Sequence, residues 1–175
     1  MKMNSRLLLI LCFFILTNCA TYTMLEPSLI VDTPTKYESS NESSFVEVFL
    51  SSDAESNGIL KRSRTNIQIA FNESLKKSGL CSIDASNPNY KITALILSCD
   101  FPLMGLDYRS DVEIKYDIKK EGSLVHSTVI KTDNVAKLGE AFVADDRLRI
   151  SIEGSLRKNT LEFIKQFDAF IKSQK

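Results

Sequence analysis

The only histidine is the first side chain to test for chemistry, since histidine is the commonest general base in enzymes. His126 would need a nucleophile such as Ser127 or a carboxylate such as Asp133. Neighbouring residues of a strand point to opposite faces, so Ser127 cannot easily meet His126. The sequence also lacks a Gly-x-Ser-x-Gly nucleophile elbow. We therefore predict no catalytic residue and expect His126 to be a partly exposed residue of a sheet.

Two adjacent carboxylates, Asp145 and Asp146, form the second candidate, because such groups bind hard cations. The flanking spacing does not resemble an EF-hand or another carboxylate cage. Acidic side chains at the start of a helix interact favourably with its dipole, and that explanation is sufficient. The sequence therefore predicts no metal site and no other cofactor.

A third kind of chemistry is indicated by a cysteine near the amino terminus. Lys2 and Arg6 precede ten apolar residues, 7–16, and Cys19 follows shortly afterwards. A helix that crosses a membrane needs about 20 apolar residues. The shorter run therefore indicates the core of a signal peptide that is removed from the mature protein.

The motif Leu16-Thr17-Asn18-Cys19 resembles the lipobox of bacterial lipoproteins, although that pattern prefers a smaller residue than Asn18. The resemblance implies that residues 1–18 are removed and that Cys19 receives a thioether diacylglycerol and further acyl chains such as palmitate. Several acyl chains make a stable anchor where one is marginal. Ala20 follows, which in the enteric pattern favours the outer membrane, so we expect a lipid anchor at its periplasmic face. The alternative is a secretory signal in which Cys19 is incidental.

The charge of the mature chain argues against nucleic acid as a partner. Removal of residues 1–18 takes away two of the 22 basic side chains and none of the 22 acidic ones. Nucleic-acid binding requires a stripe of Lys and Arg that faces phosphates. The only dense basic cluster is the short stretch 61–64. We therefore predict no nucleic-acid partner.

Two further cysteines, Cys81 and Cys99, form an even pair once Cys19 is acylated, and a disulfide is compatible with an oxidising compartment. The turn between them centres near Asn87, which would place Cys81 opposite Thr93 and not opposite Cys99. Bridging needs Cα atoms within about 7 Å. Two alternatives therefore remain, a Cys81–Cys99 disulfide and two buried thiols.

The elements that must position these residues follow from hydrophobic periodicity. Residues 59–78 have an apolar stripe at helical spacing, and Gly79 follows as a C-terminal cap. A second long helix is expected over residues 145–171. Alternation or apolar runs predict strands, at residues 45–50, 80–83, 90–101, 111–118 and 124–131.

We expect a single α+β domain over residues 45–175, with an antiparallel sheet of about four to six strands and both helices packed on one face. Residues 19–44 are expected to be the lipidated amino terminus and a polar tether. Within that tether, Leu29-Ile30-Val31 could add an edge strand, limited by Pro27 and Pro34.

An apolar loop follows the strand expected at residues 90–101, where polar residues are the rule. Leu103, Met104, Leu106 and Tyr108 are its candidate contacts for a partner, because exposed apolar patches usually mark interaction sites. The alternative is a loop that folds back over the sheet edge.

The chain resembles the YajG-type family of small bacterial envelope lipoproteins over roughly residues 45–171. The resemblance is carried by the two helix patterns and two strand segments, in particular 72–80, 90–93, 111–114 and the carboxy-terminal helix. It implies an outer-membrane lipoprotein without known catalysis and supplies no active-site residues. We therefore predict a non-enzymatic, accessory or binding component of the envelope with a protein partner. The alternative is a binding module for a small apolar or glycan ligand lodged between sheet and helices.

Overall fold

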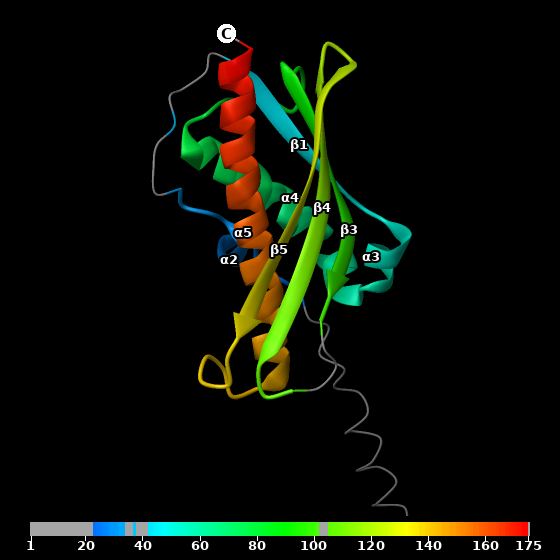
Figure 1. Cartoon of the computed structure of the whole chain (residues 1–175), viewed down its shortest axis with the longest axis vertical. Coiled ribbons are helices and arrows are strands. Elements are labelled where there is room, and N and C mark those ends of the chain that lie inside the picture. Colours follow the sequence, from blue (N-terminus) through cyan, green and yellow to red (C-terminus); the bar gives the residue numbers. More distant parts are fainter. Residues whose placement is uncertain (1–22, 34–36, 38–41, 102–104, 175) are drawn as a thin grey trace, which may run out of the picture.

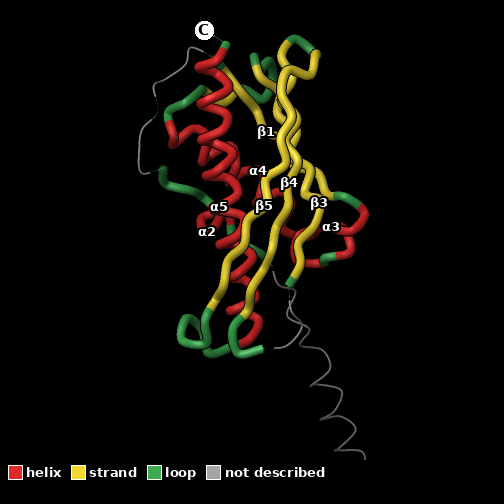
Figure 2. Tube along the Cα trace, in the orientation of Figure 1, coloured by secondary structure: helices red, strands yellow, loops and turns green. Residues whose placement is uncertain are grey.

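The computed structural model describes residues 23–33, 37, 42–101 and 105–174. Figures 1 and 2 show a long sheet with helices packed against it. The elements are, in chain order, α2 Glu26–Leu29, β1 Ser43–Leu50, α3 Ser52–Ser56, α4 Gly58–Ser78, β2 Ser82–Ile83, β3 Tyr90–Asp100, β4 Tyr108–Lys120, β5 Ser123–Ala136 and α5 Ala144–Ser173.

Within the described residues, the sheet has five strands in the order β2-β1-β3-β4-β5. β3, β4 and β5 are antiparallel neighbours, whereas β1 runs parallel to both β2 and β3. The predicted α+β class is confirmed, but the expectation of a wholly antiparallel sheet is wrong. The physical reason is that α4 carries the chain back to the starting end of β1, and such a crossover makes the next strand parallel.

A second correction concerns the turn at residues 84–89, which was expected to join two paired strands. β2 and β3 flank β1 and do not pair with each other. The turn crosses the beginning of β1, where the backbone N–H and hydroxyl of Ser43 both donate to Asn89 Oδ1, at 2.7 and 2.9 Å.

Both long helices pack on the same face of the sheet, as predicted. The fully buried ring of Tyr116, on β4, makes an edge contact with Phe71 of α4 and a stacked contact with Phe163 of α5. Its hydroxyl donates to Asn159 Oδ1 of α5 at 2.8 Å. Asn159 in turn donates to the Ile130 carbonyl of β5 at 2.9 Å. One side chain therefore joins the sheet to both helices.

Polar side chains of α4 form hydrogen bonds with the backbone of β1 along the edge that has no neighbouring strand. β2 pairs with only the first two residues of β1. Further along, Val46 N–H donates to Asn72 Oδ1 and Asn72 Nδ2 donates back to the Val46 carbonyl, both at 3.0 Å. Val48 N–H donates to Gln68 Oε1 at 3.1 Å. The helix thus replaces the missing strand, because buried backbone groups must find partners.

Two glycines, Gly79 and Gly154, have clear structural roles in the long helices. Gly79 terminates α4 with a φ of 74°, in the left-handed region expected for a C-terminal cap. Gly154 lies where α5 meets β5, and a Cβ there would collide with the side chain of Asn134. The interruption of the apolar pattern at Gly154 therefore reflects close packing of the helix on the sheet.

The segment 23–33 belongs to the folded domain, which corrects the expected tether over 19–44. Met24, Leu29 and Val31 are buried. The N–H of Met24 donates to Ser63 Oγ at 2.8 Å, and the N–H of Val31 donates to Ser74 Oγ at 2.9 Å. The edge strand expected at 29–31 is wrong, because hydroxyl groups of α4 bind this backbone and Glu26–Leu29 forms α2.

None of the helices in the described part of the chain combines the length and apolar character needed to span a bilayer.

Replacement of Tyr116 by Phe tests its role in joining sheet and helices. We expect Y116F to lower the free energy of unfolding by about 1–3 kcal/mol near pH 7, because Asn159 Oδ1 loses its buried donor. Urea unfolding measures this change. Tyr37→Phe, outside the sheet and helices, is the matched control and should change little.

The same pair of variants gives a pH test. Burial raises the pKa of the Tyr116 phenol well above its ordinary value of 10.0. In the unfolded chain this phenol ionises near pH 10, so its contribution to stability is complete below that pH and is lost as the pH rises further. Y116F should therefore lose less stability than Y37F between about pH 9 and 11. An equal loss in both variants would contradict this assignment.

Candidate functional site

The residues considered for catalysis are separated in the fold. The His126 ring stacks on Phe170 of α5, with centroids 5.1 Å apart. The Ser127 hydroxyl donates instead to Asp117 Oδ1 at 2.6 Å. Asp133 forms an ion pair with Arg109 Nε at 3.6 Å. Each group that a His-dependent reaction would need is therefore engaged elsewhere.

No group of three or more His, Cys, Asp or Glu side chains within the described ranges has the geometry to hold a metal ion. Asp145 and Asp146 lie in the first turn of α5. Asp146 makes an ion pair with Arg149 at 3.7 Å. This position agrees with the helix-dipole interpretation of the two aspartates.

Both Cys81 and Cys99 are free thiols, so the disulfide alternative is not formed. Cys81 directly precedes β2, and its sulfur lies 2.8 Å from Ser44 Oγ, at the start of β1. Ser44 is level with Tyr90, the first residue of β3. Cys99 is nine residues further along β3, which is roughly 30 Å at about 3.3 Å per residue. The two cysteines are separated because β2 and β3 start at the same end of the sheet.

Burial raises the pKa of both thiols. The Cys99 value reaches about 12, chiefly through desolvation and secondarily through the negative charge of Asp100. For Cys81 the hydrogen bond with Ser44 opposes the effect of burial only in part. Both groups are therefore protonated at neutral pH, which makes them poor nucleophiles.

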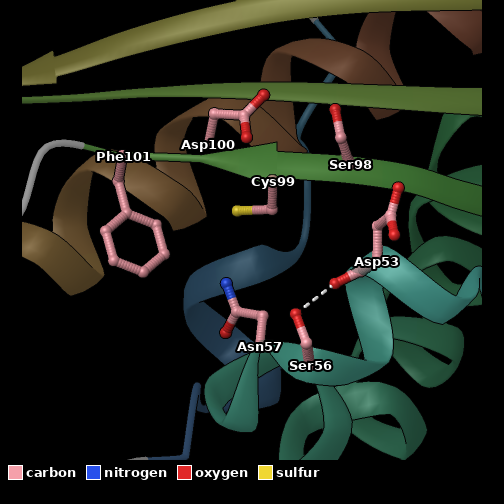
Figure 3. Close-up of a pocket in the computed structure, with 7 residues that line it drawn as sticks. All are labelled: Asp53, Ser56, Asn57, Ser98, Cys99, Asp100 and Phe101. Atoms are coloured by element: carbon pink, nitrogen blue, oxygen red, sulfur yellow. Dashed lines mark hydrogen bonds between the residues drawn. The ribbon is translucent and has the colours of Figure 1, made fainter.

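A pocket of about 640 Å³ lies between α3, the start of α4 and the end of β3 (Figure 3). The residues that line it are mostly polar, namely Asp53, Ser56, Asn57, Ser98, Cys99, Asp100 and Phe101. Asn57 caps α4, because its Oδ1 accepts the N–H groups of Ile59 and Leu60 at 3.0 and 3.2 Å.

The amide nitrogen of Asn57 is the notable feature of this pocket. It is buried and has no hydrogen-bond partner among the described residues. Figure 3 shows it directed toward β3, where Cys99 lies. A buried donor without an acceptor is costly, so an acceptor atom of a bound molecule would be favoured at this position.

An apolar surface is found where β4 begins and β5 ends, at the lower end of the molecule in Figure 1. We call it the apolar end, and it consists of Leu106, Leu138, Phe142 and Val143, with exposed fractions of 71, 47, 95 and 54%. Isolated exposed apolar residues are common, but four large ones in the loops at one tip are typical of a region that contacts another surface.

Hydrogen bonds hold the loops of the apolar end together. The N–H of Leu138 donates to Asp107 Oδ1 at 3.0 Å. Arg147 Nη1 donates to the carbonyls of Ala141 and Phe142, at 2.7 and 2.9 Å. The same guanidinium lies over the Tyr108 ring, 5.5 Å from its centroid. These contacts fix the 137–143 turn against the start of β4.

The predicted contact loop is therefore corrected in part. Leu106 is exposed, as a contact residue must be, but only 8% of Tyr108 is exposed. Tyr108 is buried because it pairs with Ala136 of β5 and packs beneath Arg147. Leu103 and Met104 lie outside the described residues. Leu138, Phe142 and Val143 were not identified from the sequence. They could have been recognised as large apolar residues close to Gly139, in a segment between a strand and a helix where polar residues are usual.

The sheet has a second exposed surface, the open face, which consists of the strand residues that point away from α4 and α5. One row of paired residues crosses it, with the charged Lys115 between the apolar pair Phe49 and Leu95 on one side and Val129 on the other. Phe49 and Val129 are 42% and 52% exposed. Ion pairs lie in and beside the row: Lys115 pairs with Asp117 at 3.0 Å, and Lys91 pairs with Glu47 at 3.1 Å.

No protein-family model and no curated protein matches this chain. Solved structures do match its fold. A Xanthomonas campestris protein of the DUF330 family is 10% identical, with a TM-score of 0.66 over 88% of this chain and 99% of that one. A hypothetical protein from Chlamydia trachomatis is 9% identical, with a TM-score of 0.56 over 75% and 98% of the two chains.

A third similar structure is a Caulobacter crescentus protein provisionally named a lipoprotein. It is 9% identical, with a TM-score of 0.50 over 74% of this chain and 92% of that one. At such identities these likenesses show a shared α+β fold. Membership of the YajG-type family stays a prediction.

Alkylation with iodoacetamide tests the state of the two thiols. A pKa of about 12 in place of 9.0 makes the thiolate fraction of Cys99 roughly 1,000-fold smaller at neutral pH. We expect Cys81 and Cys99 to label slowly in the native protein and completely in urea, as mapped by mass spectrometry. Fast native labelling, or a Cys81–Cys99 linked peptide in a non-reduced digest, would contradict the free, protonated thiols described above.

Proposed function

We propose that this chain is a bacterial envelope lipoprotein, anchored by acylated Cys19 at the periplasmic face of the outer membrane. The lipobox-like motif before Cys19 supports the anchor. The fold shared with the C. crescentus protein provisionally named a lipoprotein is consistent with it. The docking of residues 23–33 onto α4 also fits, because it leaves a short link between the lipid and the domain.

We further propose that the domain is a non-enzymatic component that binds a protein partner through its open face. One observation carries this proposal: both long helices cover one side of the sheet, while the other side has exposed Phe49 and Val129 in one row of paired residues that also contains Leu95 and Lys115. An apolar centre with a polar rim is the usual composition of a protein interface.

The charges around the row suit a partner of mixed polarity. The Lys91–Glu47 and Lys115–Asp117 pairs are partly exposed, and such pairs contribute little to stability on their own. They can therefore exchange partners when another protein docks. The engagement of His126 with Phe170 and the protonated state of the thiols support a binding role over an enzymatic one.

In-cell photo-crosslinking tests the protein-binding role. A benzophenone amino acid replaces Phe49 on the open face or Ile69 on α4, which are 42% and 41% exposed and therefore matched. We expect a specific envelope protein to crosslink at position 49 and not at position 69, as identified by affinity purification and mass spectrometry.

The same experiment with Cys19→Ser tests the anchor, and the crosslinked product should be reduced or lost. Equal products at positions 49 and 69, or none at 49, would contradict binding through the open face.

A second candidate function is the binding of a small glycan, favoured by the pocket at Asn57. The buried amide donor and the carboxylates of Asp53 and Asp100 suit a ligand rich in hydroxyl and carbonyl groups. An apolar ligand between sheet and helices is not supported, because the Tyr116, Phe71 and Phe163 rings fill that space.

Thermal denaturation with purified muropeptides tests the glycan hypothesis. A ligand at 100 times its Kd stabilises the folded state by about 2.7 kcal/mol, so the Tm should rise by several degrees. Asn57→Asp keeps the oxygen that caps α4 and removes the NH₂ donor, and it should abolish this rise. Asn87→Asp, an identical change at an exposed turn, is the control. No rise in the wild type would remove this candidate.

A further inference from the structure

We infer that the apolar end lies in the surface of the bilayer that holds the lipid of Cys19, so that the domain stands on the membrane with its β4–β5 hairpin pointing away. This inference rests on the proposed lipid anchor and adds the orientation of the domain. Its occupant is a phospholipid surface, which the short chain between the lipid and the fold keeps close to the domain.

That length is short. Three residues lie between Cys19 and Thr23, so the chain covers four Cα-to-Cα steps and at most about 14 Å. The next residue, Met24, is fully buried. Its N–H donates to Ser63 Oγ and its carbonyl accepts from Asn66 Nδ2, both at 2.8 Å. The fold is therefore held close to the lipid from residue 24 onward.

The point of attachment is in the half of the molecule that contains the apolar end. Ser63 and Asn66 belong to the first half of α4, and α4 begins beside the end of β3 at the Asn57 pocket. β3 ends next to the start of β4, since Asp100 pairs with Asp111. In Figure 1 the segment that leads into α2 lies in this half, and the β4–β5 hairpin lies at the opposite end.

The side chains of the apolar end fit a bilayer. Phe142 is 95% exposed, which is the largest exposed fraction among the exposed large hydrophobics of the described residues. Leu25, one residue beyond the buried Met24, is also 63% exposed. Loops that present Phe, Leu and Val at one tip can bury them at the boundary of headgroups and acyl chains.

Three acidic groups near this tip have partners: Asp107 and Glu140 bind the loop backbone, and Asp146 pairs with Arg149. Asp107 accepts the N–H of Leu138, and Glu140 Oε2 accepts the N–H of Lys137 at 2.6 Å. Both carboxylates thus stabilise the turn that presents Leu138 and Phe142.

A bilayer is favoured over a second protein by the reach of the link. The link keeps the lipid on Cys19 within about 14 Å of Thr23. Any molecule bound to the apolar end therefore has to fit into the space between the domain and the membrane that this distance allows. The bilayer surface can contact the apolar end directly, so nothing has to be accommodated between the domain and the membrane. A protein at this end would have to separate the domain from the membrane further than the link allows.

Tryptophan fluorescence tests the orientation, because the chain contains no tryptophan. The acylated, mature full chain is prepared with F142W at the apolar end or with L124W at the opposite end of β5, where Leu124 is 57% exposed. Each variant is reconstituted in phosphatidylethanolamine–phosphatidylglycerol vesicles, with or without brominated acyl chains. We expect the F142W fluorescence to shift to the blue and to be quenched several-fold more than that of L124W.

The outcomes separate the orientation from the anchor. Flotation of the vesicles and the mass of the amino-terminal peptide report on the anchor. Protein that floats but shows equal quenching in F142W and L124W, or none, overturns the orientation while the lipid anchor stands. Protein that is not acylated and does not float overturns both. V143W provides a second reading at the apolar end, and it should behave as F142W does.

Discussion

The contact of Tyr116 with both long helices is the interaction on which the rest of the fold depends. Its ring packs against Phe71 of α4 and Phe163 of α5, and its hydroxyl is bound by Asn159. These contacts are buried, and a buried hydroxyl is stable only with a partner. They require both helices to lie on one side of the sheet. The other side is left open, and it is the side that can meet another molecule.

Helix α4 forms hydrogen bonds with the backbone of two other segments, one on each of its sides. Toward the sheet, Asn72 and Gln68 satisfy the backbone of β1, so the parallel strand needs no long partner at that edge. Toward the amino terminus, Ser63 and Ser74 bind the backbone of the segment that contains α2. Side-chain hydrogen bonds thus replace a strand in one place and secure an irregular segment in the other.

The two exposed apolar surfaces face different directions, and this difference suits an anchored protein. The apolar end lies at the tip of the long strands, whereas the open face runs along their length (Figure 1). A domain that stands with its tip on a bilayer holds the open face at a steep angle to the membrane, where a neighbouring protein can reach it from the side. In this proposed arrangement the apolar end meets the bilayer and the open face meets a protein.

The sequence by itself determined the local features. Apolar periodicity and Gly79 predicted α4 to within one residue, alternation predicted the strand at 111–118, and the isolation of His126 argued against catalysis. Only the tertiary structure decided that β1 is parallel to its neighbours, that Cys81 and Cys99 are far apart, and that Met24 is buried. It also placed Leu138 beside Asp107, the residue that follows Leu106. The physical reason is that periodicity reports which side chains of one element are apolar, whereas strand order and loop contacts depend on groups distant in sequence, such as Asn72 with Val46 and Asp107 with Leu138.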